Sequence, residues 1–267
     1  MKELWQRLKK RRIESAVLAA LLALGALSLL PGILKPGITP DETANVLIYD
    51  SLPRIVLGAT VIYFMAVYGY SDVMKVRKGS IPFSLLWSLP CLLVAAANFP
   101  FSALITGSAV IDRTDMIWLT ALKCAAIGLM EELLFRGLIH SVIKKRLENK
   151  KYRLFFAVFI SSLVFSLWHL VNLFGGAGVG ATFMQVGYSF LIGFMLAVTL
   201  EKTGNIWICV FIHAAFNFGG TLVTDLGSGE FQDRAFWIIT VASAIICAVH
   251  VLITLAVLTK KDTRVNE

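Results

Sequence analysis

The chain has 267 residues, of which 57% are hydrophobic and only 16% are charged, and its mean hydropathy is +0.76. Because soluble globular domains carry about 25% charged residues, this composition excludes a soluble domain and indicates an integral membrane protein. The formal net charge of +8 does not indicate nucleic-acid binding, since the basic residues cluster in short stretches between apolar segments.

Eight apolar segments are each long enough to cross a hydrocarbon core of ~30 Å as a helix. They lie near residues 13-34, 54-71, 81-99, 116-139, 154-173, 183-200, 205-223 and 235-258. The sequence therefore predicts an all-α, polytopic membrane protein with about eight transmembrane helices.

The first segment also has features of a secretory signal. Residues 1-30 have the basic start and apolar core of such a signal, but no small-x-small cleavage site is visible. Since seven more spans follow, we expect a retained signal anchor that forms the first transmembrane helix.

The basic residues predict the orientation. Most of the 25 Lys and Arg residues lie at the chain ends and in every second connection. These stretches are Lys2 to Arg12, Lys75 to Lys78, Lys144 to Arg153, Lys202, and Lys260 to Arg264. The positive-inside rule places all of them in the cytoplasm, so we expect a multi-pass protein of the cell membrane with both termini cytoplasmic.

The whole chain, 1-267, is expected to be one integral membrane domain, because no repeat or soluble segment interrupts it. The first three spans contain no buried ionisable pair, whereas polar residues concentrate in spans four, five and seven. We therefore divide the domain into scaffold helices at 1-114, a core at 115-222, and the last helix with its tail at 223-267.

Two adjacent glutamates, Glu131 and Glu132, lie in the apolar fourth span, in the segment GLMEELLFRGLI. An ionised carboxylate at bilayer depth costs several kcal/mol unless it is paired or solvated. Neighbouring helical residues diverge by about 100°, so only one of the two can face the other helices fully. Arg136 lies four residues after Glu132, which predicts an ion pair between them and leaves Glu131 for chemistry.

The connection after span four predicts which residue Glu131 faces. Residues 140-153 contain no Pro or Gly, so span four is expected to continue as an amphipathic helix and to turn near Asn149. Glu131 and His169 are equally far from that turn, about 28 Å at 1.5 Å per residue. We expect them to face one another at one depth.

Two further spans carry polar or aromatic pairs spaced four residues apart, Phe165 with His169 and His213 with Asn217. Residues at this spacing share a helix face. A glutamate beside a neutral histidine can activate water as a general base. The attack of that water leaves a tetrahedral oxyanion, for which the imidazole of His213 and the amide of Asn217 can supply donors.

Together these residues form three motifs, EELLFR (131-136), FSLWH (165-169) and HAAFN (213-217). In order, spacing and placement on separate spans, they resemble the EExxxR, FxxxH and HxxxN motifs of the CPBP family, also called Abi. This family comprises CAAX prenyl proteases and bacteriocin-processing enzymes, which are intramembrane proteases. The resemblance covers about residues 115-222.

The resemblance implies an eight-helix fold with a catalytic cavity open to the cytosol. It also implies an endopeptidase that cleaves a peptide bond near the end of a membrane-associated protein or peptide. The water-activating pair would be Glu131 and His169. The other motif residues would act around them: His213 and Asn217 as oxyanion donors, and Glu132, Arg136 and Phe165 as supporting residues.

Members of this family have often been described as metalloproteases, and zinc needs three or four N, S or O ligands. With a metal present, the ligands would be Glu131, His169 and His213. Because HExxH is absent and Asn217 is a poor zinc ligand, we expect a metal-free site without a cofactor. The expected partners are membrane lipid and a membrane-tethered or exported peptide, and no nucleic acid.

Each polar pair also has a structural interpretation. Glu132 and Arg136 are compatible with a purely structural ion pair, and His213 with Asn217 is compatible with a hydrogen bond between helices. The alternative functions are a non-catalytic bacteriocin self-immunity or scaffold protein and, since buried Glu and His also form proton relays, a proton-coupled transporter. The sequence lacks the paired broken helices and inverted repeat that are typical of transporters.

The cysteines Cys91, Cys124, Cys209 and Cys247 lie in or beside apolar spans and show no CxxC spacing. This pattern indicates packing residues and not a disulfide frame or a metal site. His140 fits no motif and is interpreted as an interfacial or packing residue.

Overall fold

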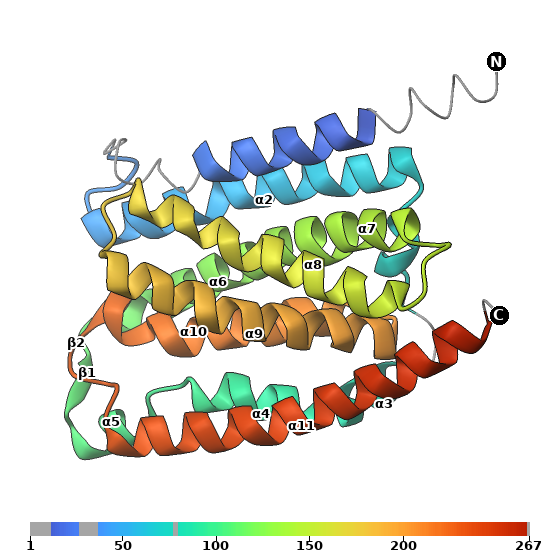
Figure 1. Cartoon of the computed structure of the whole chain (residues 1–267). Coiled ribbons are helices and arrows are strands. Elements are labelled where there is room, and N and C mark those ends of the chain that lie inside the picture. The colour runs from blue at the N-terminus through green and yellow to red at the C-terminus, as the bar shows by residue number, and fades with distance from the viewer. Residues whose placement is uncertain (1–11, 27–36, 77–79, 266–267) are drawn as a thin grey trace.

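The computed structural model describes residues 12–26, 37–76 and 80–265, nearly all of them in helices (Figure 1). Residues 12–26 form a helix, and the others follow in chain order: α2 (Glu42–Tyr68), α3 (Ser80–Trp87), α4 (Leu89–Ala97), α5 (Phe101–Thr106), α6 (Ile117–Glu132), α7 (Ser141–Arg146), α8 (Arg153–Trp168), α9 (Val179–Thr203), α10 (Ile206–Leu226) and α11 (Arg234–Val265). Shorter elements connect them: the 3-10 helices η1 (Ser71–Met74), η2 (Thr114–Met116) and η4 (His169–Leu173), the π-helix η3 (Leu133–His140), and the strands β1 (Ala109–Ile111) and β2 (Gly227–Gly229).

Within the described residues, five helices are long and apolar enough to cross a membrane, and the bent pair α3 and α4 would make a sixth. The five are α2, α8 together with η4, α9, α10 and α11. The prediction of an all-α, polytopic membrane protein is thereby confirmed. The first predicted span runs into residues 27–36, and the expected signal anchor includes residues 1–11, both of which lie outside the described residues.

The predicted start of the second span at residue 54 is wrong, because α2 begins at Glu42. Asp41 caps the helix by accepting a backbone N–H with its side chain at 2.9 Å. Two charged residues lie within the helix, where Arg54 Nη1 is 2.9 Å from Asp50 Oδ1 one turn earlier. Their charges neutralise each other within the helix.

The third predicted span consists of two helices, α3 and α4, which meet at an angle of 55°. The break lies at Ser88, between Trp87 and Leu89, and Pro90 follows within the first turn of α4. Proline has no backbone N–H, and its ring disfavours helical geometry in the preceding residue. A bend at this point therefore follows from the sequence.

The fourth predicted span continues without interruption, as expected, from Ile117 through α6, η3 and α7 to Arg146. The turn to α8 occupies residues 147–152 and includes the predicted turning point, Asn149. Its middle part, Leu133–His140, was not expected to differ from an α-helix but is a π-helix. The i→i+5 hydrogen bonds of a π-helix widen the turn and so change the direction of its side chains.

The connections that carry the basic residues lie at one end of the bundle. Figure 1 places the turn after α2, the α7–α8 turn, the α9–α10 turn and the end of α11 at this end, opposite β1 and β2. Ion pairs join the elements there: Arg146 Nη2 lies 2.6 Å from Glu14 Oε1, and Arg153 Nη2 lies 2.6 Å from Asp262 Oδ1. The bundle therefore has one basic end.

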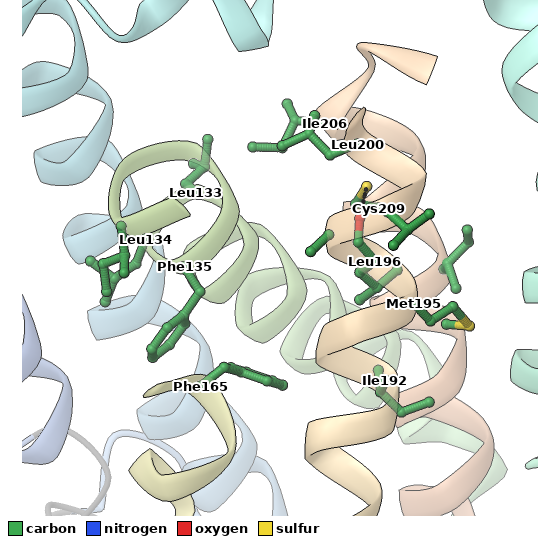
Figure 2. Packing of buried hydrophobic residues seen from close by; sticks show 14 of the residues in the cluster. Leu133, Leu134, Phe135, Phe165, Ile192, Met195, Leu196, Leu200, Ile206 and Cys209 are labelled. Atoms are coloured by element: carbon green, nitrogen blue, oxygen red, sulfur yellow. Dashed lines mark hydrogen bonds between the residues drawn. The ribbon is translucent and has the colours of Figure 1, made fainter. Parts of the chain in front are cut away.

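Helix α6 packs against α2 and α10, and η3 packs against α8. At Gly128 the backbone of α10 comes so close that an added Cβ would lie 3.1 Å from Ala214 N and from Val210 O. Membrane helices associate through close packing of this kind, for which small residues are suited. Figure 2 shows the apolar layer beside η3, where the rings of Phe135 and Phe165 are 5.0 Å apart.

The four cysteines are buried and form no disulfide. Cys91 Sγ lies 3.8 Å from Cys247 Sγ, which is a packing contact between α4 and α11. The prediction that the cysteines are packing residues is confirmed.

Candidate active site

The two adjacent glutamates lie at the end of α6, where the α-helix passes into the π-helix η3. Glu131 is 8% exposed and Glu132 is fully buried, while Arg136 on η3 is 1% exposed. A charged group without water needs partners of opposite charge and hydrogen bonds. The partners of these two glutamates come from η3 and α10.

The predicted ion pair between Glu132 and Arg136 is present, with Arg136 Nη1 2.9 Å from Glu132 Oε1. Its alignment does not make a hydrogen bond, and Glu132 Oε2 and both terminal nitrogens of Arg136 lack hydrogen-bond partners among the described residues. A buried ion pair is weak evidence for net stability, because desolvation offsets its attraction. What this pair does is hold Glu132 Oε1 in one position beside α10.

His213 of α10 lies between the two glutamates. Its Nδ1 is 2.7 Å from Glu132 Oε1, and its Nε2 is 3.5 Å from Glu131 Oε2. An ionised carboxylate only accepts hydrogen bonds, so with Glu132 ionised the proton between them is on Nδ1. A neutral His213 then turns the lone pair of Nε2 towards Glu131, and only the imidazolium donates from both nitrogens.

Glu131 was expected to face His169, but its closest polar contact is His213. No hydrogen bond joins Glu131 to His169 in the part of the chain that the structure describes, although the two side chains are within electrostatic range. The expectation considered only the turn between α7 and α8. The close approach of α10 at Gly128 brings His213 to the carboxylates instead.

His169 is located where α8 ends and the chain tightens into η4. It is half-buried, and its ring packs edge-on against Phe165 with 5.3 Å between the ring centroids. Within the described residues its ring nitrogens have no hydrogen-bond partner. The ring nitrogens of His169 therefore form no structural hydrogen bond within the described residues.

Phe165 contacts members of all three motifs. Arg136 Cζ lies 4.2 Å from the centroid of its ring, and the ring of His213 lies 5.8 Å away at 86°. A cation over an aromatic face contributes about 0.5–2 kcal/mol, with the larger value where water is excluded. Because His169 packs against the same ring, Phe165 fixes the spacing between η3, α8 and α10.

Gly193 of α9 makes room for this arrangement. A Cβ at this position would lie 2.9 Å from Phe165 Cδ1 and 3.1 Å from Arg136 Nη2. Any larger residue would displace one of these two side chains. The motif spacing did not identify Gly193, because the three motifs lie on α6, α8 and α10 and none on α9.

Asn217 lies one turn after His213 on α10 and is half-buried. Its side-chain amide makes no hydrogen bond to any residue that the structure describes. The neighbouring position Phe216 offers its carbonyl to Asn98 Nδ2 at 2.7 Å, which fixes this part of α10 against α4. The contact with Asn98 thus holds α10 at this level, and the side-chain amide of Asn217 takes no part in it.

Among the described residues there is no group of three or more His, Cys, Asp or Glu side chains placed to hold a metal ion. Glu131, His169 and His213, the ligands considered from the sequence, do not meet this condition.

A second buried polar cluster lies further along η3. His140 Nε2 is 2.8 Å from Glu201 Oε1, and its Nδ1 is 3.1 Å from Ser161 Oγ. Lys144 Nζ is 2.6 Å from the other oxygen of Glu201. His140 is thus a buried, hydrogen-bonded residue that joins η3 to α8 and α9, which agrees with the packing alternative of its interpretation and not with the interfacial one.

A third polar contact joins α6 to α10 on the other side of the glutamates. Lys123 Nζ lies 2.5 Å from Asp225 Oδ2, with the two side chains 7% and 19% exposed. Together with the His213–Glu132 bond, it fixes α6 and α10 at two levels. The sequence did not identify this pair, because 102 positions separate its members.

Residues 113–219 match the family model described as type II CAAX prenyl endopeptidase Rce1-like. The matched segment extends from just before η2 into α10 and contains all three motifs as well as Gly193. No curated protein and no solved structure matches the chain.

Proposed function

We propose that the chain is a membrane peptidase that cleaves a peptide bond near the end of a membrane-associated protein or peptide. The match of residues 113–219 to the Rce1-like family of type II CAAX prenyl endopeptidases supports this proposal. The observation that carries this proposal is the position of His213 between Glu131 and Glu132. Ionisable groups that converge inside a membrane bundle mark functional sites.

In the proposed reaction Glu131 is the general base. It takes a proton from a water molecule held between it and His169, and the resulting hydroxide attacks the carbonyl carbon of the scissile bond. The tetrahedral oxyanion is stabilised by donors from His213 and Asn217. When the intermediate collapses, the C–N bond breaks and Glu131 returns the proton to the leaving amine.

The choice of Glu131 over Glu132 as the base rests on their partners. Glu132 Oε1 is close to both Arg136 and His213, at 2.9 and 2.7 Å. These two contacts occupy that oxygen. Glu131 has one longer contact, 3.5 Å to His213, which leaves its carboxylate free to bind and deprotonate water.

The proposed role of His213 sets a condition on its protonation. Glu132 accepts a hydrogen bond from Nδ1, so donation from Nε2 to an oxyanion requires protons on both nitrogens. Asn217, one turn away, donates in any protonation state.

We also propose that the fold comprises eight transmembrane helices in the cell membrane, with the cavity open to the cytosol and both termini cytoplasmic. The gathering of basic connections at one end supports this orientation. The proposed core at 115-222 corresponds closely to the matched segment 113–219, with scaffold helices at 1-114 and the last helix and tail at 223-267.

The family's description names a CAAX prenyl endopeptidase, and we extend that substrate class to this chain. The test uses purified protein in lipid nanodiscs with two peptides, a farnesylated C-a-a-X peptide and the same peptide without the lipid. Mass spectrometry should detect the released C-terminal fragment with the wild type and none with Glu131→Gln. A result in which Glu131→Gln cleaves like the wild type, or in which neither peptide is cut, would overturn the proposal.

A further inference from the structure

A cavity of about 630 Å³ lies between the start of α8 and the last turns of α11, at the basic end of the bundle. Its volume is in the range of ligand-binding pockets, about 300–1,000 Å³. Phe155 and Phe156 of α8 and Leu252 of α11 form much of its apolar wall, and all three are exposed. Their exposure in a membrane protein means that this wall faces lipid.

Two lysines, Lys151 and Lys260, line the same cavity. Both are exposed, and neither forms an ion pair with any residue that the structure describes. The neighbouring carboxylate of Asp262 is engaged by Arg153 through three contacts of 2.6 to 2.9 Å. The cavity thus combines an apolar wall with uncompensated positive charge.

A hydroxyl in the wall also lacks a partner. Thr254 and Thr263 of α11 each donate a hydrogen bond to the carbonyl four residues earlier, as helical threonines commonly do. The buried hydroxyl of Thr259, between them, has no hydrogen-bond partner among the described residues. Rotation about its χ1 bond would let this hydroxyl reach an acceptor oxygen in the cavity.

We propose that this cavity binds one anionic phospholipid, with its phosphate between Lys151 and Lys260 and an acyl chain along Phe155, Phe156 and Leu252. A soluble anion would not use the apolar wall, and a neutral lipid would not use the lysines. Basic pockets between transmembrane helices are suited to such headgroups. The site is separate from the polar cluster, since Phe155 and Phe165 on α8 are about 15 Å apart along the helix.

The experiment is native mass spectrometry of the full chain in a neutral detergent. The protein is titrated with phosphatidylglycerol or with phosphatidylcholine of identical acyl chains, and separately with glycerol phosphate as a headgroup without chains. We expect one phosphatidylglycerol to be retained at concentrations where phosphatidylcholine is not, and glycerol phosphate not to displace it. Equal retention of the two lipids overturns the proposal, and displacement by glycerol phosphate shows a simple anion site instead.

Two sets of variants locate the bound lipid. Lys151→Ala with Lys260→Ala should weaken binding on the order of 30-fold, because each lysine near the membrane surface contributes about 1 kcal/mol. The matched control is Lys145→Ala with Lys202→Ala, which removes the same charge from side chains that lie over Tyr70 and Phe83 outside the cavity. Equal weakening in both double variants would mean general attraction to the basic end and would overturn the assignment.

A third variant tests the apolar part of the site. Ala256→Trp fills the cavity wall of α11 while leaving both lysines in place. We expect it to reduce phosphatidylglycerol retention as much as the lysine variant does. Unchanged retention in Ala256→Trp would show that the lipid does not enter the cavity.

Discussion

His213 Nδ1 lies 2.7 Å from Glu132 Oε1, so that a bond across 81 positions joins α10 to the end of α6. The same carboxylate oxygen is 2.9 Å from Arg136 Nη1. Glu132 Oε1 thus contacts both Arg136 and His213, while the contact of Glu131 with His213 is longer, at 3.5 Å. The difference between the two glutamates lies in their partners more than in their burial, which is nearly complete for both.

Glu131→Gln should abolish cleavage while the protein remains folded. The amide has nearly the same shape as the carboxylate but cannot accept the proton from water, and loss of a general base lowers rates by about 10²–10⁴-fold. Cleavage of the anchored peptide and the melting temperature in detergent are measured together. Glu148→Gln, an exposed glutamate in the α7–α8 turn, is the control and should retain full activity.

Glu132→Gln and Arg136→Met should each destabilise the protein strongly. Either change leaves one buried charge without its partner, which costs about 3–5 kcal/mol. The double variant should lose less unfolding free energy than the two single variants lose together, because it removes both charges. Asp72→Asn breaks the exposed Asp72–Lys75 pair and should change the melting temperature little. Strict additivity of the two buried changes would contradict an ion pair.

Gly193→Ala should reduce activity more than its single added methyl group suggests. The new Cβ would push Phe165 or Arg136 out of position, and overpacking of this kind costs about 1–3 kcal/mol. Gly187→Ala on the same helix is a matched control, because its Cβ would meet nothing within 4 Å. We expect Gly187→Ala to keep wild-type activity and stability. Equal behaviour of the two variants would refute the packing argument.

Activity should survive removal of metal ions. The proposed reaction uses Glu131 and His169 on water, and the described residues provide no group of three metal ligands. Protein treated with EDTA or 1,10-phenanthroline and then freed of chelator should cleave at the wild-type rate, with zinc content measured by mass spectrometry. Loss of activity that added zinc restores would replace the proposed mechanism with a metal-dependent one.

The contribution of the Asp41 carboxylate to the stability of the fold should be lost at low pH. Its hydrogen bond from Arg113 Nη2, at 2.7 Å, and that from the backbone of Ala44 lower the pKa of Asp41 below its ordinary value. A carboxylate with a lowered pKa stabilises the fold above its unfolded pKa of about 3.9, and this contribution is lost as pH falls through the folded value. The melting-temperature difference between wild type and Asp41→Asn should therefore shrink between pH 6 and pH 3. A constant difference would count against this role.

Sequence periodicity and spacing predicted the features that are formed within one helix or between elements that follow each other in the chain. The Glu132–Arg136 pair is one example, because both residues lie on consecutive turns of the same span. The continuous helix from Ile117 to Arg146 and the turn around Asn149 follow equally from local composition. The roles of the motif residues remain predictions.

Features that depend on how helices pack could not be predicted from spacing. The contact of His213 with both glutamates follows from the close approach at Gly128, and the clearance at Gly193 is made by a helix without a motif. The π-helix over Leu133–His140 has no composition signal of its own. The hydrogen bond of His140 could not be predicted for a similar reason, since its partner Glu201 lies on a different helix.

The ring of Phe165 touches Arg136, His169 and His213 at once, and this makes it a natural spectroscopic probe. A single fluorine on that ring would change its resonance whenever a neighbouring imidazole gains a proton or a ligand moves the guanidinium. The protonation steps of the three motifs could then be followed at one atom, inside a membrane, without mutating any of the residues that carry them out.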